Sequence, residues 1–451
     1  MSLRTPELLA PAGSLAMLET AFAFGATAVY AGQPRYSLRV RNNDFGHIVV
    51  LKQGIDRAHE LGHKFFLVSN IFPHDNKIKS YVQNMAPVIA LKPDAMIMSD
   101  PGLIMIVRET WPEMEIHLSV QANTVNSAAV KFWKSVGVSR VILSRELSLD
   151  QVAQIRQECP DTELEVFVHG ALCIAYSGRC LLSGYFNHRD ANQGSCTNSC
   201  RWDYKTLPGV VDASGDILAP QAAAERARED SHGEVHVIEE SQRPGSYMPI
   251  EEDEHGTYVM NSKDLRAIEH VRRLVEIGVD SLKIEGRTKS PYYVARTAQS
   301  YRQAIDDAVA GRELDPALLG QLEGLANRGY TSGFFQRHTP ESTQNYLRGY
   351  SESGRSLYVG DVLSFDPARG LAEVNVRNKF AVGDWLEIIH PQGNHNVQLS
   401  QMENLDGLPM TVAPGSGHIV WLPLPASSVG AFVARYVSDP EFEGTPNQVS
   451  A

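Results

Sequence analysis

Cysteine is scarce in this chain, which has five cysteines among 451 residues. So few cysteines in so long a chain exclude the disulfide scaffold of small secreted domains. Long apolar runs are missing as well, and no stretch approaches the roughly 18 residues of a membrane-spanning helix. The first residues also lack the apolar core of a secretory signal, so we expect a cytoplasmic protein with no membrane partner.

Positive charge is in deficit. The chain has 41 lysines and arginines against 53 acidic residues, a formal net charge of −12. This balance excludes a protein that coats nucleic acid through charge alone, because such binding depends on many cationic contacts with phosphates. A local basic patch remains compatible with it. Much of the acidity lies between Glu225 and Glu254, among serine, proline and glycine, which indicates a solvated excursion of the chain.

The first two-thirds of the chain alternate short apolar segments with amphipathic ones. Segments with apolar residues three and four positions apart, typical of helices, are 14–24, 51–61, 78–89, 127–135 and 149–158. Strand-like segments are 7–10, 28–31, 64–68, 95–98, 115–120, 140–143, 164–168 and 281–284. This alternation predicts a parallel sheet, and eight strands favour a closed (β/α)8 barrel of the TIM type. A doubly wound open sheet is the alternative.

The pattern changes from about Tyr350, where helical spacing gives way to short alternating segments separated by turns. These segments are 356–359, 371–376, 385–389 and 418–421. They predict a small antiparallel β-barrel. We therefore expect two domains: a barrel domain over residues 1–340, with an acidic insertion near 206–256, and a C-terminal domain over 350–440. The junction is expected between Arg337 and Gly354.

Four cysteines lie close together after the seventh predicted strand. Cys173, Cys180, Cys196 and Cys200 span 28 residues, with gaps of six, fifteen and three residues. A folded loop can bring four sulfurs together at these spacings, as an iron–sulfur cluster or a zinc ion requires. Zinc fingers usually carry close Cys-x-x-Cys pairs, which the sequence lacks, so the spacing favours the cluster, with zinc or unliganded thiols as alternatives. Cys159 stands apart and is interpreted as a structural thiol.

The residues around these cysteines resemble the signature of the collagenase-like peptidase family of unknown catalytic type. The resemblance is carried by residues 169–180 and 196–201, and by the motifs at 7–13, 36–39, 145–148 and 282–287. It runs from residue 7 to about 335 and continues into the predicted C-terminal barrel. The acidic stretch between Asp212 and Glu254 departs from the family's pattern near the cysteines but leaves all four cysteine positions intact.

The resemblance implies RNA modification. Members of the family take part in 5-hydroxylation of the wobble uridine of tRNA, with a requirement for prephenate, and other relatives modify a ribosomal cytidine or assist hydroxylation in ubiquinone synthesis. For this chain the resemblance implies a tRNA substrate, prephenate or a related small carboxylate, and an iron–sulfur cluster, expected as 4Fe–4S, on the four cysteines. Zinc is the alternative or replacement occupant. Oxygen insertion into uracil needs a cofactor, because side chains cannot supply the redox chemistry.

Two contrasting hypotheses remain beside a tRNA uridine 5-hydroxylase. The first is a peptidase, which needs an activated nucleophile, a pair of carboxylates that activate water, or a catalytic zinc ion with an open position. The sequence has no Gly-x-Ser-x-Gly motif, although residues 59–63 read His-Glu-Leu-Gly-His, the zinc-binding pattern of metallopeptidases. The second is a noncatalytic RNA-binding protein with a structural metal. We predict the hydroxylase.

The candidate site residues follow predicted strands, whose ends converge on one rim of such a barrel. His169 and Glu285 are predicted to be catalytic, because each can reach the rim and handle a proton. Arginine suits the two carboxylates of prephenate, since it makes paired hydrogen bonds with a carboxylate. The predicted substrate-binding residues are Arg39, Arg41, His74, Gln121, Asn123, Arg145 and Arg287. Each arginine alone is more often a surface or ion-paired residue, and the shared placement at the rim is what favours substrate binding.

Two further interpretations concern charge. Lys283 alternates with the apolar residues of its strand, so it is expected to point into the barrel in an ion pair with Glu285. The run from Arg287 to Arg296 combines cations with two tyrosines and is a candidate tRNA contact. Other candidates are Arg201, Trp202 and Lys205 beside the cysteines, and the C-terminal barrel by fold analogy.

Overall fold

The computed structural model describes most of the chain in separate stretches. Backbone and side chains are described for residues 3–32, 35–37, 43–171, 264–287, 289–325, 330–336 and 356–436. Between 172 and 263 only the backbones of short strands are described. The side chains of the four clustered cysteines fall in this interval, and Arg39 and Arg41 fall between 38 and 42. The predictions for these six residues therefore lie outside the described side chains, as does the predicted domain junction.

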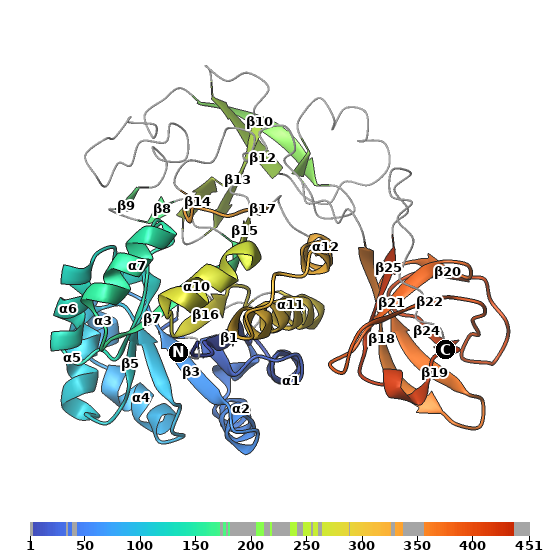
Figure 1. The fold of residues 1–451 in the computed structure, drawn as a ribbon, viewed down its shortest axis with the longest axis horizontal. Coiled ribbons are helices and arrows are strands. Elements are labelled where there is room, and N and C mark those ends of the chain that lie inside the picture. The colour runs from blue at the N-terminus through green and yellow to red at the C-terminus, as the bar shows by residue number, and fades with distance from the viewer. Residues whose placement is uncertain are drawn as a thin grey trace.

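Eight parallel strands form the closed barrel that the sequence predicts (Figure 1). Each strand pairs with the next in the ring, and the last closes it by pairing with both the first and the seventh. The strands are β1 (Glu7–Pro11), β2 (Ala28–Gly32), β3 (Lys64–Ser69), β4 (Ala95–Met98), β5 (Ile116–Leu118), β6 (Arg140–Ile142), β7 (Glu163–Ala171) and β16 (Ser281–Ile284). The open-sheet alternative is excluded.

Helices connect the strands and surround the barrel (Figure 1). They are α1 (Leu15–Ala23), α2 (Ile48–Glu60), α3 (Asp75–Ile78), α4 (Tyr81–Ile89), α5 (Pro101–Thr110), α6 (Ser127–Ser135), α7 (Leu149–Glu158), α10 (Val271–Ile277), α11 (Pro291–Val309) and α12 (Ala317–Glu323). Local signals fix several ends: Ser148 and Gln151 form a capping box at the start of α7. The helix expected over 78–89 is interrupted at Ser80, whose hydroxyl bonds the Lys77 carbonyl. Within the described part of the chain, no helix is long and apolar enough to cross a bilayer.

The acidic insertion contains an antiparallel sheet that the sequence analysis did not predict. Its strands are β10 (Tyr204–Val211), β11 (Ile217–Leu218), β12 (Val235–Glu240), β13 (Tyr247–Asp253) and β14 (Gly256–Val259). β12 reads Val-His-Val-Ile-Glu-Glu, so only its first three residues alternate between apolar and polar with the period of a strand. A short hairpin of β8 (Ala175–Tyr176) and β9 (Arg179–Cys180) follows β7. β15 (Asp264–Arg266) then returns the chain to the barrel by pairing with the end of β7 and with β17 (Tyr330–Thr331).

The C-terminal domain is an antiparallel sheet with its own apolar core, as the sequence predicts. In sheet order its strands are β22 (His395–Gln398), β21 (Trp385–Ile389), β25 (Phe432–Tyr436), β18 (Ser356–Asp366), β19 (Leu371–Val376) and β24 (Ile419–Leu422). A separate pair consists of β20 (Phe380–Ala381) and β23 (Val412–Ala413). Among the described ladders, none joins β22 to β24, so the predicted closure into a barrel is not part of these pairings.

Helix α11 joins the two domains. The rings of Tyr292 on α11 and Tyr358 on β18 stack with their centres 4.5 Å apart. One turn further along α11, both ends of the Arg296 guanidinium bond the carboxylate of Glu387 on β21. The Gln299 side chain donates to the Asn394 side chain and accepts from it, at 3.0 Å in each direction. Stacking, an ion pair and an amide pair together fix the C-terminal domain against the barrel.

Candidate functional site

Arg145 and Glu285 meet at the rim formed by the carboxyl ends of the barrel strands. Arg145 follows β6 and Glu285 follows β16, and Nη2 of the arginine lies 3.5 Å from Oε2 of the glutamate. Their side chains are 12% and 10% exposed, and the guanidinium carbon lies 3.7 Å from the centre of the Phe167 ring. An arginine held against a ring and beside a carboxylate keeps its charge at low cost in a partly buried site.

The position of Glu285 is set by its own backbone. Its N–H donates to the His169 carbonyl over 2.8 Å, and its carbonyl accepts from the Tyr293 hydroxyl over 2.8 Å. Gly170, with φ +102°, lies directly against this segment, and a Cβ at that position would stand 2.5 Å from the Glu285 carbonyl oxygen. Only glycine allows β7 and the end of β16 to approach so closely in this backbone conformation.

His169 is buried below the rim, with 1% of its surface exposed. Its Nδ1 lies 3.3 Å from the hydroxyl of Tyr301, which donates its own proton to the Val168 carbonyl over 2.7 Å. Nδ1 therefore carries the proton, and Nε2 is the acceptor. Burial lowers the pKa of His169 to about 3, so the ring is neutral at neutral pH. The rings of Tyr293 and Tyr330 also pack against it. Its catalytic role stays a prediction.

Arg287 lies at the rim next to the end of β2. Its Nη1 donates to the Ser37 hydroxyl over 2.8 Å, and its guanidinium carbon lies 5.9 Å from the centre of the Tyr30 ring. A Cβ at Gly32 would come within 2.5 Å of the same Nη1 atom. Glycine at the end of β2 therefore leaves the space that Arg287 occupies.

A polar cluster joins the ends of β3, β4 and β5. The amide oxygen of Gln121 accepts hydrogen bonds from Asn70, from Ser119 over 2.9 Å and from Ser99 over 3.4 Å. Three donors on one oxygen fix the orientation of this amide. Gln121 is half-buried, so its position at the rim is compatible with the predicted contact with substrate.

Asn123 and His74 occupy other parts of the rim. Asn123 has a left-handed backbone with φ 53°, and its side-chain oxygen accepts from the Ser144 hydroxyl over 3.0 Å. His74 is exposed and directly precedes α3. The described contacts place neither residue against the Arg145–Glu285 pair.

A hollow lies beside Arg145, between the ends of β6 and β7 and the segment around β17. Its wall is mostly apolar, and Arg145 is the charged residue in it. The lining residues are Leu143, Ser144, Arg145, Val166, Phe167, Leu265, Ser332, Phe334 and Phe335.

Phe167 and Ser37 are site residues that the sequence analysis missed. Phe167 follows Glu165 by two positions in β7, and strand alternation puts these two on the inward face, whereas a bulge after Phe167 turns His169 toward the tyrosines of α11. That alternation was the available signal. Ser37 lies inside the 36–39 motif, but nothing in the sequence pattern indicates its bond to Arg287.

The cysteine segment leaves the barrel at this rim. Cys173 follows the last residue of β7, Ala171, by two positions, and Cys180 pairs with Ala175 in the β8–β9 hairpin. The four thiols are a donor set that suits an iron–sulfur cluster or zinc. Among the described side chains, no group of three His, Cys, Asp or Glu residues could hold a metal ion. Cys159 is buried, with its Sγ 3.6 Å from the Ser127 carbonyl, which agrees with a structural thiol.

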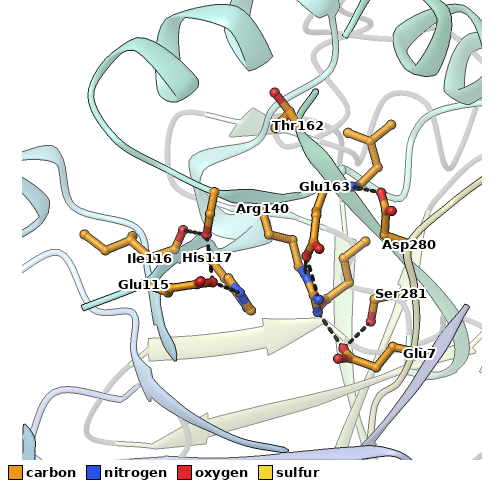
Figure 2. A network of polar contacts seen from close by, with 12 residues as sticks. Glu7, Glu115, Ile116, His117, Arg140, Thr162, Glu163, Asp280 and Ser281 are labelled. Carbon is orange, nitrogen blue, oxygen red and sulfur yellow. Dashed lines mark hydrogen bonds and ion pairs between the residues drawn. The ribbon is translucent and has the colours of Figure 1, made fainter. Parts of the chain in front are cut away.

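Charged residues also fill the lower barrel interior, and Figure 2 shows the part around Arg140 and Glu7. Glu165 is fully buried and bonds Lys283 Nζ over 2.7 Å and Arg140 Nη1 over 3.2 Å. The predicted pairing of Lys283 with Glu285 is therefore wrong. Lys283 points inward as expected. Glu285 lies past the end of β16, whereas Glu165 lies on the neighbouring strand β7, within reach of the lysine. Burial lowers the pKa of Lys283, and Glu165 opposes this shift.

The interpretation of residues 287–296 as a tRNA contact is wrong for Tyr292, Tyr293 and Arg296, whereas Lys289 is exposed and its contact stays a prediction. Tyr292 and Tyr293 are 5% and 6% exposed, and Arg296 is 1% exposed. These side chains pack into the barrel and against the C-terminal domain, so they offer neither charge nor stacking surface to a large partner. Arg201, Trp202 and Lys205 lie outside the described side chains.

Comparisons with known proteins cover nearly the whole chain. The sequence profile of "Peptidase family U32" matches residues 13–345, and that of its C-terminal domain matches residues 355–433. "tRNA hydroxylation protein P" of Escherichia coli is 59% identical over 427 residues, which cover 93% of this chain and 94% of that protein. The protein of the same name from Haemophilus influenzae is 57% identical over 430 residues, 93% of each chain. "23S rRNA 5-hydroxycytidine C2501 synthase" of Escherichia coli is 29% identical over 397 residues, 85% of this chain and 52% of that protein. The chain belongs to peptidase family U32.

Proposed function

We propose that this chain is a tRNA-modifying enzyme that hydroxylates C5 of the wobble uridine and depends on prephenate and an iron–sulfur cluster. Two relatives named for tRNA hydroxylation, at 59% and 57% identity over 93% of the chain, support the tRNA substrate and the reaction type. A relative named as a 5-hydroxycytidine synthase supports C5, because cytidine and uridine present the same carbon to an oxidant.

The observation that carries the proposal is that the rim groups flank the end of β7, from which the chain continues to the cysteines. Arg145 and Glu285 lie 3.5 Å apart at the ends of β6 and β16, and β7 runs between these two strands. β7 continues to Ala171, two positions before Cys173. Chemistry in parallel barrels takes place at this rim. A substrate held by the rim residues would therefore face the segment that supplies the cluster's thiols.

The cluster would be held by Cys173, Cys180, Cys196 and Cys200. Thiolates are the donors that such clusters require, and these four lie within 28 residues. When bound, the cluster would supply electron transfer, which no side chain of the rim provides. Zinc on the same thiols is the alternative, and it would favour a structural role.

The hollow beside Arg145 has a volume of about 10 Å³, room for one water-sized group such as an end of a carboxylate, so the ring of a ligand would lie outside it. Leu143, Val166 and Leu265 supply apolar wall, and Arg145 supplies a guanidinium that makes paired hydrogen bonds with a carboxylate. Glu285 balances the arginine's charge, so binding of a carboxylate would exchange one acceptor for another. Prephenate has a ring and two carboxylates, and Arg287 at the same rim is a second cation for it.

Peptidase activity is not favoured by the described residues. A buried, neutral His169 packed against tyrosines is unsuited to activate a nucleophile, because the group it contacts, Tyr301, already donates its proton to a backbone carbonyl. The described side chains also lack a three-ligand metal site of the kind that catalytic zinc requires.

The proposal is tested by mass spectrometry of nucleosides from tRNA. Cells that lack the gene should lose the hydroxylated wobble uridine, and the wild-type gene should restore it. A host that cannot make prephenate should fail to form it even with the wild-type gene, and supplied prephenate should restore it. Unchanged hydroxylation in cells without the gene would refute the function, and hydroxylation in the prephenate-deficient host would refute the prephenate requirement alone. Hydroxylation of ribosomal cytidine in the same cells serves as the control.

A further inference from the structure

Exposed cations and an exposed aromatic ring lie together beside the end of β3. Phe72 is 41% exposed, and the chain then runs through His74 and α3 to two exposed lysines. Arg35, from the loop after β2, is also exposed, and its Nη2 donates to the Ser80 hydroxyl over 3.1 Å. We call this surface the α3 platform, and its residues are Arg35, Phe72, His74, Lys77 and Lys79.

Buried side chains hold the platform's two loops together. Tyr36 and Tyr81 are both fully buried, and their rings meet edge to face with centres 4.8 Å apart. The Ile71 N–H donates to the Tyr36 carbonyl over 3.2 Å, and the Asn84 amide donates to the Tyr36 hydroxyl over 2.7 Å. The loops that carry the exposed side chains are therefore held in place, which reduces the conformational entropy lost when a partner binds.

The charge of the platform's two lysines is available to a partner. Among the described residues, no carboxylate forms an ion pair with Lys77 or Lys79, and Asp75 is the single acidic residue between 72 and 80. Helix α6 gives a direct contrast on the same protein. There the ring of Phe132 is 56% exposed between two lysines, but each lysine has a carboxylate oxygen within 3.5 Å. The same residue types are thus neutralised on α6 and not on the platform.

Resting on the proposed function, we propose that the α3 platform binds the single-stranded loop of the RNA substrate. Phe72 stacks on an unpaired base, and Arg35, Lys77 and Lys79 contact the phosphates beside it. An aromatic ring among cations suits bases and phosphates together, which an acidic protein does not offer. The formal net charge of the chain is −12, so RNA binding depends on local cationic surfaces such as this one.

The platform also lies close enough to the barrel rim for a base of the bound RNA to reach it. Phe72 follows Asn70 by two positions, and Asn70 bonds Gln121 in the polar cluster at the rim. An RNA loop held on the platform therefore lies at the edge of the barrel opening, where one flipped nucleotide can reach the rim while its neighbours remain bound outside.

Binding of a fluorescent anticodon stem-loop to the full-length protein tests the platform. We expect Phe72→Ala to weaken binding about tenfold or more, the effect of removing one base-stacking ring. We expect Lys77→Gln with Lys79→Gln to reduce the slope of log affinity against log salt by about 1.4, since each lost single-strand phosphate contact contributes about 0.7. The matched controls, Phe132→Ala and Lys131→Gln with Lys134→Gln on α6, should leave affinity and slope unchanged.

Two results would overturn the inference: platform variants that bind like the α6 variants, or a wild-type protein that does not bind the stem-loop. Nucleoside analysis of cells that carry each variant separates this failure from failure of the proposed function. If wild-type cells hydroxylate tRNA while Phe72→Ala keeps full affinity, the platform is refuted and the function stands. If wild-type cells do not hydroxylate tRNA, the function itself fails.

Discussion

Removal of the Glu387 carboxylate should strongly destabilise the protein, because it leaves a buried arginine without its partner. The Arg296 side chain is 1% exposed and that of Glu387 is 10% exposed, and two hydrogen bonds join them across the domain boundary. Burial alone would lower the pKa of Arg296, but Tyr292 and Glu387 raise it above the ordinary value. The guanidinium therefore stays charged when Glu387 is present, and removal of that carboxylate leaves a buried charge. Breaking one side of such a buried pair costs about 3–5 kcal/mol.

Urea unfolding of Glu387→Ala, followed by fluorescence and by limited proteolysis between the domains, measures this cost. Asp56→Ala is the control, because the Lys52–Asp56 pair on α2 is 59% and 49% exposed and should contribute no more than about 0.5 kcal/mol. Replacing both partners, as Arg296→Met with Glu387→Leu, should recover most of the lost stability, since an apolar pair leaves no buried charge. If Glu387→Ala costs no more than Asp56→Ala, the reasoning about this interface is refuted.

Three further predictions concern the barrel and its rim. Gly170→Ala should lower stability by about 1–3 kcal/mol in thermal unfolding and abolish hydroxylation. The backbone has φ +102°, and the new Cβ would stand 2.5 Å from the Glu285 carbonyl oxygen. Gly62 has open space around it, so a loss no larger than that of Gly62→Ala would contradict this prediction. His169 should contribute a loss of stability of about 1.6 kcal/mol between pH 6.5 and 5, because the unfolded chain binds a proton that this buried ring, with a pKa of about 3, does not. Burial also lowers the pKa of His117, which adds to the slope, so His169→Phe should remove only its own share, and an unchanged slope would count against the neutral ring. Arg145→Lys should weaken prephenate binding in calorimetry about tenfold, since lysine cannot make the paired hydrogen bonds, and equal affinity would show that prephenate binds elsewhere.

The barrel could be predicted from the sequence because the strand pattern, the helical spacing and the helix-capping residues all indicate the same fold. The apolar runs of the strands are short, the helices between them have spacing of three and four, and Ser148 with Gln151 marks the start of α7 in the sequence itself. Tertiary contacts decide what the pattern cannot. Tyr292 and Arg296 of α11 read as a polar surface, but the second domain covers them, and Tyr293 packs inside the barrel domain. In the insertion, charged composition masks the short, mostly apolar segment 235–238 that begins β12.

The candidate site could be predicted only as far as its position. Strand ends place Arg145, Glu285 and Arg287 at one rim, because parallel strands all point the same way. The partners of each group depend on distances across the barrel, which the sequence does not contain. Thus Lys283 bonds Glu165 and not Glu285, and Arg287 bonds Ser37. The α3 platform was missed for a related reason, because exposure and the absence of a neighbouring carboxylate are three-dimensional properties.

The most direct test of the account is the amount of hydroxylated wobble uridine in tRNA from cells whose only copy of the gene encodes Cys180→Ser. Cys159→Ser is the matched control, since Cys159 is a buried thiol apart from the other four. Iron and sulfide are measured on each protein after anaerobic purification. The account predicts that Cys159→Ser keeps both the cluster and the modification, whereas Cys180→Ser loses both. Full hydroxylation by Cys180→Ser, or zinc without sulfide in the active wild-type protein, would contradict it.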